Sequence, residues 1–254
     1  MSDLPPEVAK ILTIDGGFHV RQAVDNMAWI DMGEWALVVD ALEQPELEDE
    51  VFDAILATLG DRPVRYLLNT HTHRDHTALN DAFARRGVEI VNARRCEIPP
   101  DGRTFEGARR SALMIPMGGC HTAEDCVIRI PQDRVLFVGD LFGWGLIPCG
   151  RLDRKMVTRL VTTYERLIQF DDASVVIPGH GPLCTTGELK RWVDYFQWLL
   201  EEVPRACRAG GSEKDIAARV PPPADMSGWW RFLDWKHADS VAKVAEAVRA
   251  GRLK

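Results

Sequence analysis

The sequence lacks the features that mark exported, membrane-spanning and disulfide-rich proteins. Its 254 residues contain no apolar run of membrane-spanning length, so we expect no membrane association. Residues 1–7 carry no basic region and no apolar core, so we expect no signal peptide. The six cysteines form no CxxC pair and, without an export signal, are interpreted as thiols rather than as a disulfide framework. A cytoplasmic location is therefore expected.

Acidic residues outnumber basic ones, 38 to 31, and repeats, low-complexity segments and triad-like nucleophile motifs are absent. The net charge of −7 disfavours a protein that mainly neutralises nucleic-acid backbones. A hydrophobic content of 46% and a charged content of 27% are typical of soluble globular proteins. The length fits one α/β domain over residues 1–205, with a helical C-terminal extension over residues 206–254 packed on it. We expect a small-molecule substrate and no nucleic-acid partner.

Hydrophobic periodicity predicts strands that alternate with helices. Strands are expected at residues 11–14, 20–24, 28–32, 35–39, 64–68, 88–91, 112–115, 126–130, 134–138 and 174–177. Helices are expected at residues 46–59, 77–86, 153–170, 213–219 and 240–250, and from a Thr185–Glu188 capping box onward. Residues 97–108 are rich in turn formers and show no pattern. The early hairpins and the number of elements favour an α/β sandwich over an eight-unit barrel.

Three histidines and one aspartate fall within six residues, directly after the apolar run 64–68. That run predicts a buried strand that ends in a loop. Imidazole nitrogens and carboxylate oxygens bind divalent metals such as zinc at about 2.0–2.2 Å. The chain has only seven histidines, so three in one short window are poorly explained as incidental residues of a solvated loop. We predict a metal site here. Its residues are His71, His73, Asp75 and His76.

Three further polar residues each follow a predicted strand in a loop bounded by glycine: His121, Asp140 and His180. Glycine beside such a residue lets the backbone turn sharply and approach a site closely. Each residue taken alone would indicate a surface histidine or a turn. Together with the first cluster, they predict a single site.

The order of these seven residues resembles the metallo-β-lactamase-fold superfamily of metallohydrolases, over roughly residues 10–200. The resemblance implies a four-layered αβ/βα sandwich with metals in a cleft at the strand ends. It also implies two divalent metal ions per chain, with zinc expected and iron or manganese as alternatives. By this resemblance His71, His73 and His121 hold one ion, Asp75, His76 and His180 hold the other, and Asp140 bridges them.

The segment after Asp140 points to a branch of that superfamily. Gly139-Asp140-Leu141-Phe142, followed by Cys149-Gly150-Arg151, resembles glyoxalase II and the persulfide dioxygenases. The resemblance implies a hydrolase in which a metal-bridging hydroxide, oriented by Asp75, attacks the carbonyl of a thioester, ester or lactone. The alternatives are a mononuclear iron persulfide dioxygenase-like oxidoreductase that uses only His71, His73 and Asp140, a β-lactam hydrolase, and a non-catalytic regulator.

Three residues after Asp140 are candidates for contacting substrate. Arg151 has the side chain suited to grip a substrate carboxylate, with a structural salt bridge as the alternative. Phe142 and Trp144 are expected to line the cleft or its rim, with a place in the core as the alternative.

Other residues are expected to be structural. Asp40, at the end of a predicted strand, is interpreted as a hydrogen-bond acceptor rather than a ligand. Cys149 is interpreted as a packed cysteine. The tryptophan-rich segment 229–235 is expected to anchor a helix on the sandwich, and the alternatives are a cover over the cleft or a homodimer contact.

Overall fold

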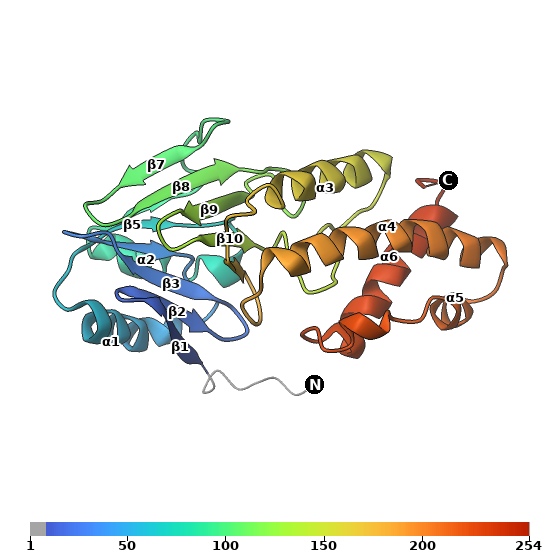
Figure 1. Cartoon of the computed structure of the whole chain (residues 1–254), viewed down its shortest axis with the longest axis horizontal. Coiled ribbons are helices and arrows are strands. Elements are labelled where there is room, and N and C mark those ends of the chain that lie inside the picture. The colour runs from blue at the N-terminus through green and yellow to red at the C-terminus, as the bar shows by residue number, and fades with distance from the viewer. Residues whose placement is uncertain (1–8, 254) are drawn as a thin grey trace. The chain divides into compact units, whose positions relative to one another are not determined.

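The computed structural model describes residues 9–253. These residues form two mixed β-sheets with flanking helices (Figure 1). The expectation that residues 1–7 carry no signal peptide falls outside the described residues. The chain forms two compact units. Unit 1 comprises the chain up to Asp140 together with Asp172–Cys184, and unit 2 comprises Leu141–Asp171 and the chain from Thr185 onward. Both sheets lie in unit 1.

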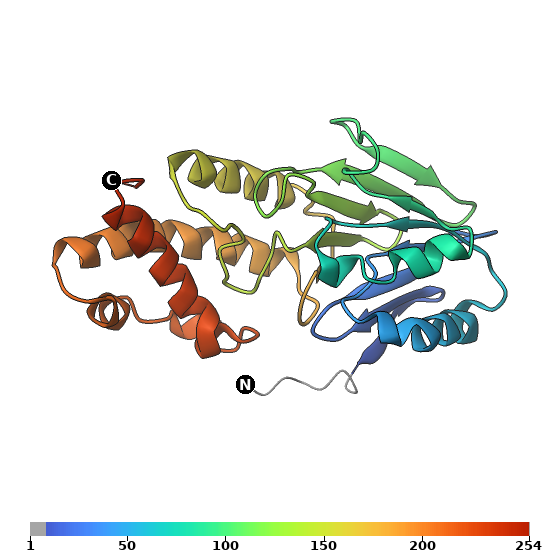
Figure 2. The ribbon, with the colours of Figure 1, turned by 180° about the vertical axis from the view of Figure 1, so that it is seen from behind.

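The first sheet places its six strands side by side in chain order. The first four strands form the predicted antiparallel hairpins, and the last three run parallel because helices α1 and α2 return the chain between them. Both helices cover one face of this sheet (Figure 2). Trp29 and Leu67 of the sheet share one buried cluster with Ile55 and Phe83 of the helices. The elements are β1 (Lys10–Asp15), β2 (Phe18–Gln22), β3 (Met27–Asp31), β4 (Ala36–Val39), α1 (Glu48–Leu59), β5 (Val64–Leu68), α2 (Asn80–Arg85) and β6 (Glu89–Val91).

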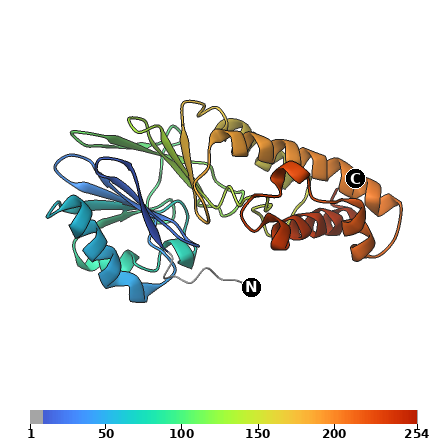
Figure 3. The ribbon, with the colours of Figure 1, turned by 60° about the horizontal axis from the view of Figure 1, so that its bottom comes forward.

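The second sheet has the order β11-β10-β9-β8-β7, antiparallel except for the parallel pair of β10 and β11. Its inner face packs on the other face of the first sheet (Figure 3), and Phe18 stacks on Phe137 with ring centroids 6.0 Å apart. The predicted sandwich is therefore confirmed, and no barrel is formed by residues 9–253. The strands are β7 (Arg103–Glu106), β8 (Ser111–Pro116), β9 (Cys126–Ile130), β10 (Val135–Gly139) and β11 (Val175–Pro178).

Strand β7 lies where the sequence predicts only turns. It is an edge strand of four residues, and Phe105 is its one buried side chain. Charged or polar residues occupy its other positions, so it carries no alternating apolar pattern. Its pairing with β8, rather than its own composition, makes it a strand.

Unit 2 is helical. Its core contains Tyr164 stacked on Trp192 at 3.8 Å between ring centroids, and Trp192 in turn stacks on Phe196. The Thr185–Glu188 capping box is confirmed, with both of its reciprocal hydrogen bonds present. The domain boundary predicted after residue 205 falls inside α4 and remains a prediction. The helices are α3 (Arg154–Leu167), α4 (Thr186–Arg208), α5 (Glu213–Arg219) and α6 (His237–Arg249). Among residues 9–253, no helix has both the length and the apolar character needed to cross a bilayer.

Candidate metal centre

The histidine-rich segment forms a tight loop directly after β5. Asn69 and Thr70 are buried, and Arg74–His76 then form a single 3-10 turn, η3. This turn occupies the residues before α2, which therefore begins at Asn80 rather than at the predicted residue 77. The loop brings its imidazoles and its carboxylate to one end of the sandwich, where the loops after β8 and β10 also end.

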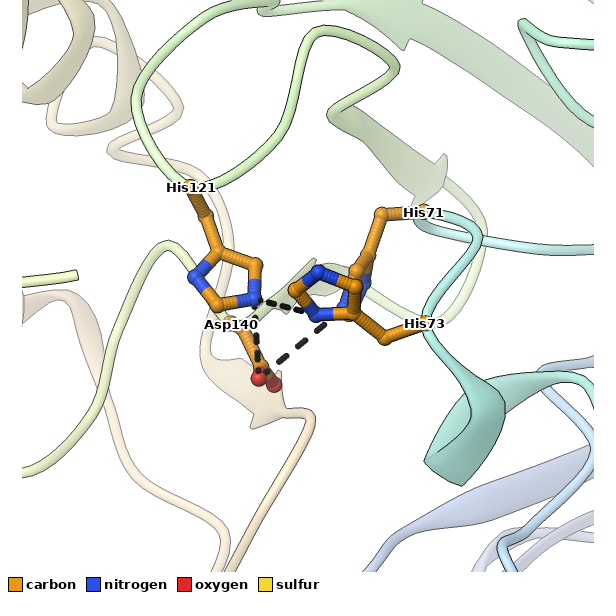
Figure 4. Close-up of side chains that lie close together, drawn as sticks. All are labelled: His71, His73, His121 and Asp140. Atoms are coloured by element: carbon orange, nitrogen blue, oxygen red, sulfur yellow. Dashed lines mark hydrogen bonds and ion pairs between the residues drawn. The ribbon is translucent and has the colours of Figure 1, made fainter. Parts of the chain in front are cut away.

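Four side chains form a first group, which consists of His71, His73, His121 and Asp140 (Figure 4). Their candidate ligand atoms all lie within 4.8 Å of one another. His121 Nε2 lies 2.9 Å from His73 Nδ1 and 3.4 Å from Asp140 Oδ2. His71 Nε2 lies 3.9 Å from the same carboxylate oxygen. Three imidazole nitrogens and one carboxylate oxygen therefore converge on one point.

A second group consists of Asp75, His76, Asp140 and His180, again with all ligand atoms within 4.8 Å. His180 Nε2 lies 3.1 Å from Asp75 Oδ2 and 3.4 Å from Asp140 Oδ2. His76 Nε2 lies 3.3 Å from Asp140 Oδ1. Asp140 thus belongs to both groups. The structure brings together all seven residues that the sequence singles out, and all seven lie in unit 1.

Several polar atoms of these groups are buried without a hydrogen-bond partner among residues 9–253. They are His71 Nε2, together with His76 Nε2 and Asp140 Oδ1, which face each other at 3.3 Å as an ion pair. A buried polar atom that stays unsatisfied, such as His71 Nε2, costs about 1–3 kcal/mol. A divalent cation in each group would satisfy all three atoms. Nitrogen and carboxylate donors fit zinc, iron and manganese alike. The residues present therefore fit two metal ions without selecting the element.

Comparison with known proteins agrees with this geometry. The family model described as the metallo-beta-lactamase superfamily matches residues 87–180, which include His121, Asp140 and His180. A hydroxyacylglutathione hydrolase from Rhizobium meliloti (strain 1021) is 30% identical over 125 residues, and the match spans 45% of this chain and 47% of that protein. The chain is thus similar to the metallo-β-lactamase superfamily over residues 87–180. It spans about half the length of this curated relative.

Solved structures show the metallo-β-lactamase fold. A metallo-beta-lactamase from Pontibacter korlensis superposes with a TM-score of 0.61 at 22% identity, over 74% of this chain and 99% of its own. A metallo-beta-lactamase from Hirschia baltica gives 0.54 at 21% identity, over 74% and 97%. The sec-alkylsulfatase Pisa1 from Pseudomonas sp. gives 0.73 at 15% identity, over 95% of this chain and 50% of its own. The likeness to the alkylsulfatase thus extends over almost the whole chain.

Asp40 connects the two ends of the histidine loop. Its Oδ1 accepts a hydrogen bond from Thr70 N at 2.8 Å. Its Oδ2 accepts one from Thr70 Oγ1 at 2.8 Å and lies 3.0 Å from His76 Nδ1. With Nδ1–H donating to Asp40, the lone pair of His76 lies on Nε2, which faces the second group. Asp40 is thus a hydrogen-bond acceptor outside both groups, as predicted, but its contact with His76 was not foreseen.

A buried asparagine triad, consisting of Asn69, Asn80 and Asn92, supports the same loop. Asn69 Nδ2 donates to the carbonyl of His76 at 2.8 Å, which closes the loop on its own first residue. Asn80 and Asn92 both donate to Asn69 Oδ1, at 2.9 and 3.0 Å. The sequence analysis did not predict this triad, because its members lie 11 and 23 residues from Asn69.

Glycine next to His180 permits the close approach that the sequence predicts. A Cβ at Gly179 would lie 2.1 Å from Asp140 Oδ1 and 2.7 Å from His76 Cε1. Both distances are well inside van der Waals contact, so a side chain at this position would displace residues of the second group.

Burial and charge give the two groups different protonation behaviour before any ion binds. Burial, and then the charge on His76, lower the pKa of His71 to about 2, so its ring is neutral. Burial alone would lower the pKa of His180, but pairing with Asp140 and Asp75 raises it to about 10. Burial likewise opposes the ionisation of Asp75, yet its hydrogen bond to His180 and the charge on His76 lower its pKa to about 2. The second group therefore contains ion pairs between imidazolium and carboxylate side chains, and a metal ion that binds there would replace the imidazolium protons.

The residues predicted to contact substrate lie in unit 2, whereas the seven candidate metal ligands lie in unit 1. Phe142 and Trp144 are buried, with ring centroids 5.3 Å apart, and each packs on Trp229 at 5.7 Å. Within unit 2 they form an aromatic core, which matches the alternative interpretation. Arg151 is exposed. Cys149 is buried, as predicted. The assignment of Phe142, Trp144 and Arg151 to substrate remains a prediction.

Proposed function

We propose that this protein is a binuclear metallohydrolase that cleaves a thioester. The observation that carries the proposal is the pair of four-residue groups of His and Asp side chains that share Asp140. The match to a hydroxyacylglutathione hydrolase supports a thioester over the ester and lactone alternatives, because a hydroxyacyl group on the glutathione thiol is a thioester. The match of residues 87–180 to the superfamily model supports hydrolysis as the reaction class.

The two groups would each hold one divalent ion, with zinc as the expected metal. When bound, two such ions supply a water that is nucleophilic at neutral pH and an electrophile for the substrate carbonyl. The chain's own contribution is to fix the donor atoms and to keep them in the correct tautomer. The proposed ligands of the first ion are His71, His73, His121 and Asp140, and those of the second are Asp75, His76, Asp140 and His180.

Asp75 is the carboxylate best placed to act on the attacking water. Its side chain is 29% exposed, whereas that of Asp140 is 14% exposed and faces four imidazole rings. Asp75 also belongs to only one group, so it retains an oxygen that is not committed to both ions. We assign Asp75 the role of accepting a hydrogen bond from the water and orienting it toward the carbonyl carbon.

The experiment combines metal analysis with a substrate panel. Purified protein is analysed for metal and assayed with a hydroxyacyl thioester of glutathione, a lactone and a chromogenic β-lactam. We expect two equivalents of metal and thioester turnover that is lost on chelation and in His73→Ala. Thr72→Ala is the matched control, because Thr72 lies beside His73 and contributes no donor to either group.

Two results would overturn the proposal. One is a single equivalent of iron with persulfide-dependent oxygen consumption, which would favour the dioxygenase alternative. The other is a fully metal-loaded protein that leaves the thioester intact.

A further inference from the structure

A single buried carboxylate organises the loop that carries His121. Asp125, which is 3% exposed, lies four residues after this histidine. Its Oδ2 accepts hydrogen bonds from His121 N at 2.8 Å and from Cys120 N at 3.2 Å. Its Oδ1 accepts from Thr122 N at 2.8 Å and from Thr122 Oγ1 at 2.6 Å. Three consecutive backbone N–H groups, including that of His121, therefore point at one side chain.

The backbone of the same residue closes the other side of the loop. The carbonyl of Asp125 accepts hydrogen bonds from Met117 N at 2.8 Å and from Gly118 N at 3.1 Å. The next residue, Cys126, donates its N–H to the carbonyl of Thr70 at 2.7 Å. Thr70 directly precedes His71. The Asp125–Cys126 step thus connects the His121 loop to the loop that carries His71 and His73.

The residues that lead into His121 do not by themselves restrict the loop to one shape. Gly118 and Gly119 precede His121, and Gly119 has a φ of +90°, so the backbone here has wide conformational freedom. An ionised carboxylate forms strong hydrogen bonds to N–H groups, and its charge is costly to bury unless such donors surround it. The buried carboxylate of Asp125 is therefore stable only in this loop conformation, and its hydrogen bonds in turn stabilise this conformation over others.

We propose that Asp125 is a positioning residue that sets the metal affinity of the first group by fixing the backbone of His121. The proposal rests on the proposed function only in requiring that both groups bind metal. The second group depends on His76, Asp75 and His180, none of which lies on this loop. Loss of Asp125 is expected to lower the affinity of the first group for its metal ion by roughly tenfold to a hundredfold, as seen for residues that orient metal ligands. The second ion is expected to keep its affinity.

The test is a titration of the metal-free, full-length protein with Co²⁺, followed by its absorption spectrum. Wild type is expected to bind two equivalents in separable steps, and His73→Ala and His180→Ala assign the steps to the first and second groups. Asp125→Asn is expected to weaken the first-group step alone. The substituted side chain keeps the volume of the aspartate but turns an NH₂ group toward backbone N–H groups.

Two further variants separate positioning from general destabilisation. Thr122→Val removes one of the four donors to Asp125, so a smaller loss in the same step is expected even where Asp125→Asn folds poorly. Asp31→Asn is the matched control, because Asp31 is an equally buried aspartate that accepts from Gly33 N at 2.8 Å and belongs to neither group. It is expected to lower the unfolding temperature while leaving both Co²⁺ steps unchanged.

The outcomes separate the two proposals. An unchanged first step in both Asp125→Asn and Thr122→Val, or an equal weakening of both steps, would overturn the role of Asp125. Wild type that binds two Co²⁺ ions but cleaves no thioester when loaded with zinc would overturn the hydrolase proposal alone. Wild type that takes up no Co²⁺ would overturn both.

Discussion

Replacing Asp40 by asparagine should weaken the binding of the second metal ion without unfolding the protein. The substituted side chain would keep an oxygen for Thr70 N but would place an NH₂ group where Oδ2 of Asp40 now faces His76 Nδ1 at 3.0 Å. That NH₂ group donates to Nδ1 only if the imidazole proton moves to Nε2. Because Nε2 faces the second group, the protonated nitrogen could no longer bind a cation.

The magnitude follows from the charge-assisted hydrogen bond between the Asp40 carboxylate and His76 Nδ1, which orients His76 and which the variant loses. A hydrogen bond of this kind is worth about 1.5–3 kcal/mol, and each 1.4 kcal/mol is tenfold in affinity. The second ion should therefore bind about 10- to 100-fold more weakly. Asp40→Ala should in addition lower the free energy of unfolding by about 3 kcal/mol or more, because buried donors of Thr70 and His76 lose their acceptors.

The assay is a zinc titration of each chelator-stripped variant by calorimetry, with chemical denaturation as the measure of stability. The first ion should bind Asp40→Asn nearly as tightly as wild type, because its four proposed ligands are retained. Wild-type affinity for both ions in Asp40→Asn would refute the tautomer argument. An equal loss of affinity for both ions would show instead that Asp40 acts through Thr70 on the whole loop.

Three further changes test other parts of unit 1. Because the pKa of His180 is raised to about 10 in the metal-free protein, its charge stabilises the fold fully below pH 6.5, and this stability is lost as the pH rises toward 10. Thermal unfolding at several pH values should show this loss of stability. Calorimetry in buffers of different ionisation enthalpy should show that a proton is released when metal binds. Arg110→Met leaves the buried Asp133 without its 2.7 Å partner, so urea unfolding should report a loss of about 3–5 kcal/mol with unchanged metal content, and a loss below about 1 kcal/mol would contradict the assignment. Gly179→Ala should reduce metal content by forcing a Cβ against the shared carboxylate, whereas Gly150→Ala, with open space around its Cβ, should not.

The seven donor residues could be predicted from the sequence because each lies at a place that is recognisable locally. They follow apolar strands, are flanked by glycine or by one another, and have side chains with a strong preference for metals. Their grouping into two sets with Asp140 in common came from the family resemblance, and the structure places the side chains accordingly. The strands and helices were predictable for the same reason, except β7, whose four residues carry a single buried apolar side chain.

The residues that hold the donors in place could not be predicted in the same way. Asp40 contacts His76 across 36 positions of the chain, and Asn92 contacts Asn69 across 23. Aspartate and asparagine at such positions are usually turn or surface residues, and only the tertiary structure shows which buried donors they face. Asp125 is the exception, because its contacts with residues 120–122 are local. An aspartate that follows a Cys-His-Thr segment by three residues could have suggested a loop closed on its own side chain.

The discontinuity of unit 1 has a consequence for how the protein acquires its metal during synthesis. The chain leaves unit 1 after Asp140 and returns at Asp172 to supply β11 and His180. Six of the seven candidate metal ligands are thus translated at least about forty residues before the last one, His180. At about 5–20 residues per second this is an interval of roughly 2–8 s. A nascent chain at that stage contains a complete first group and a second group without His180. The order of translation therefore favours loading of the first ion before the second, and a ribosome-bound chain from which Asp140 but not His180 has emerged would be expected to capture one ion at most.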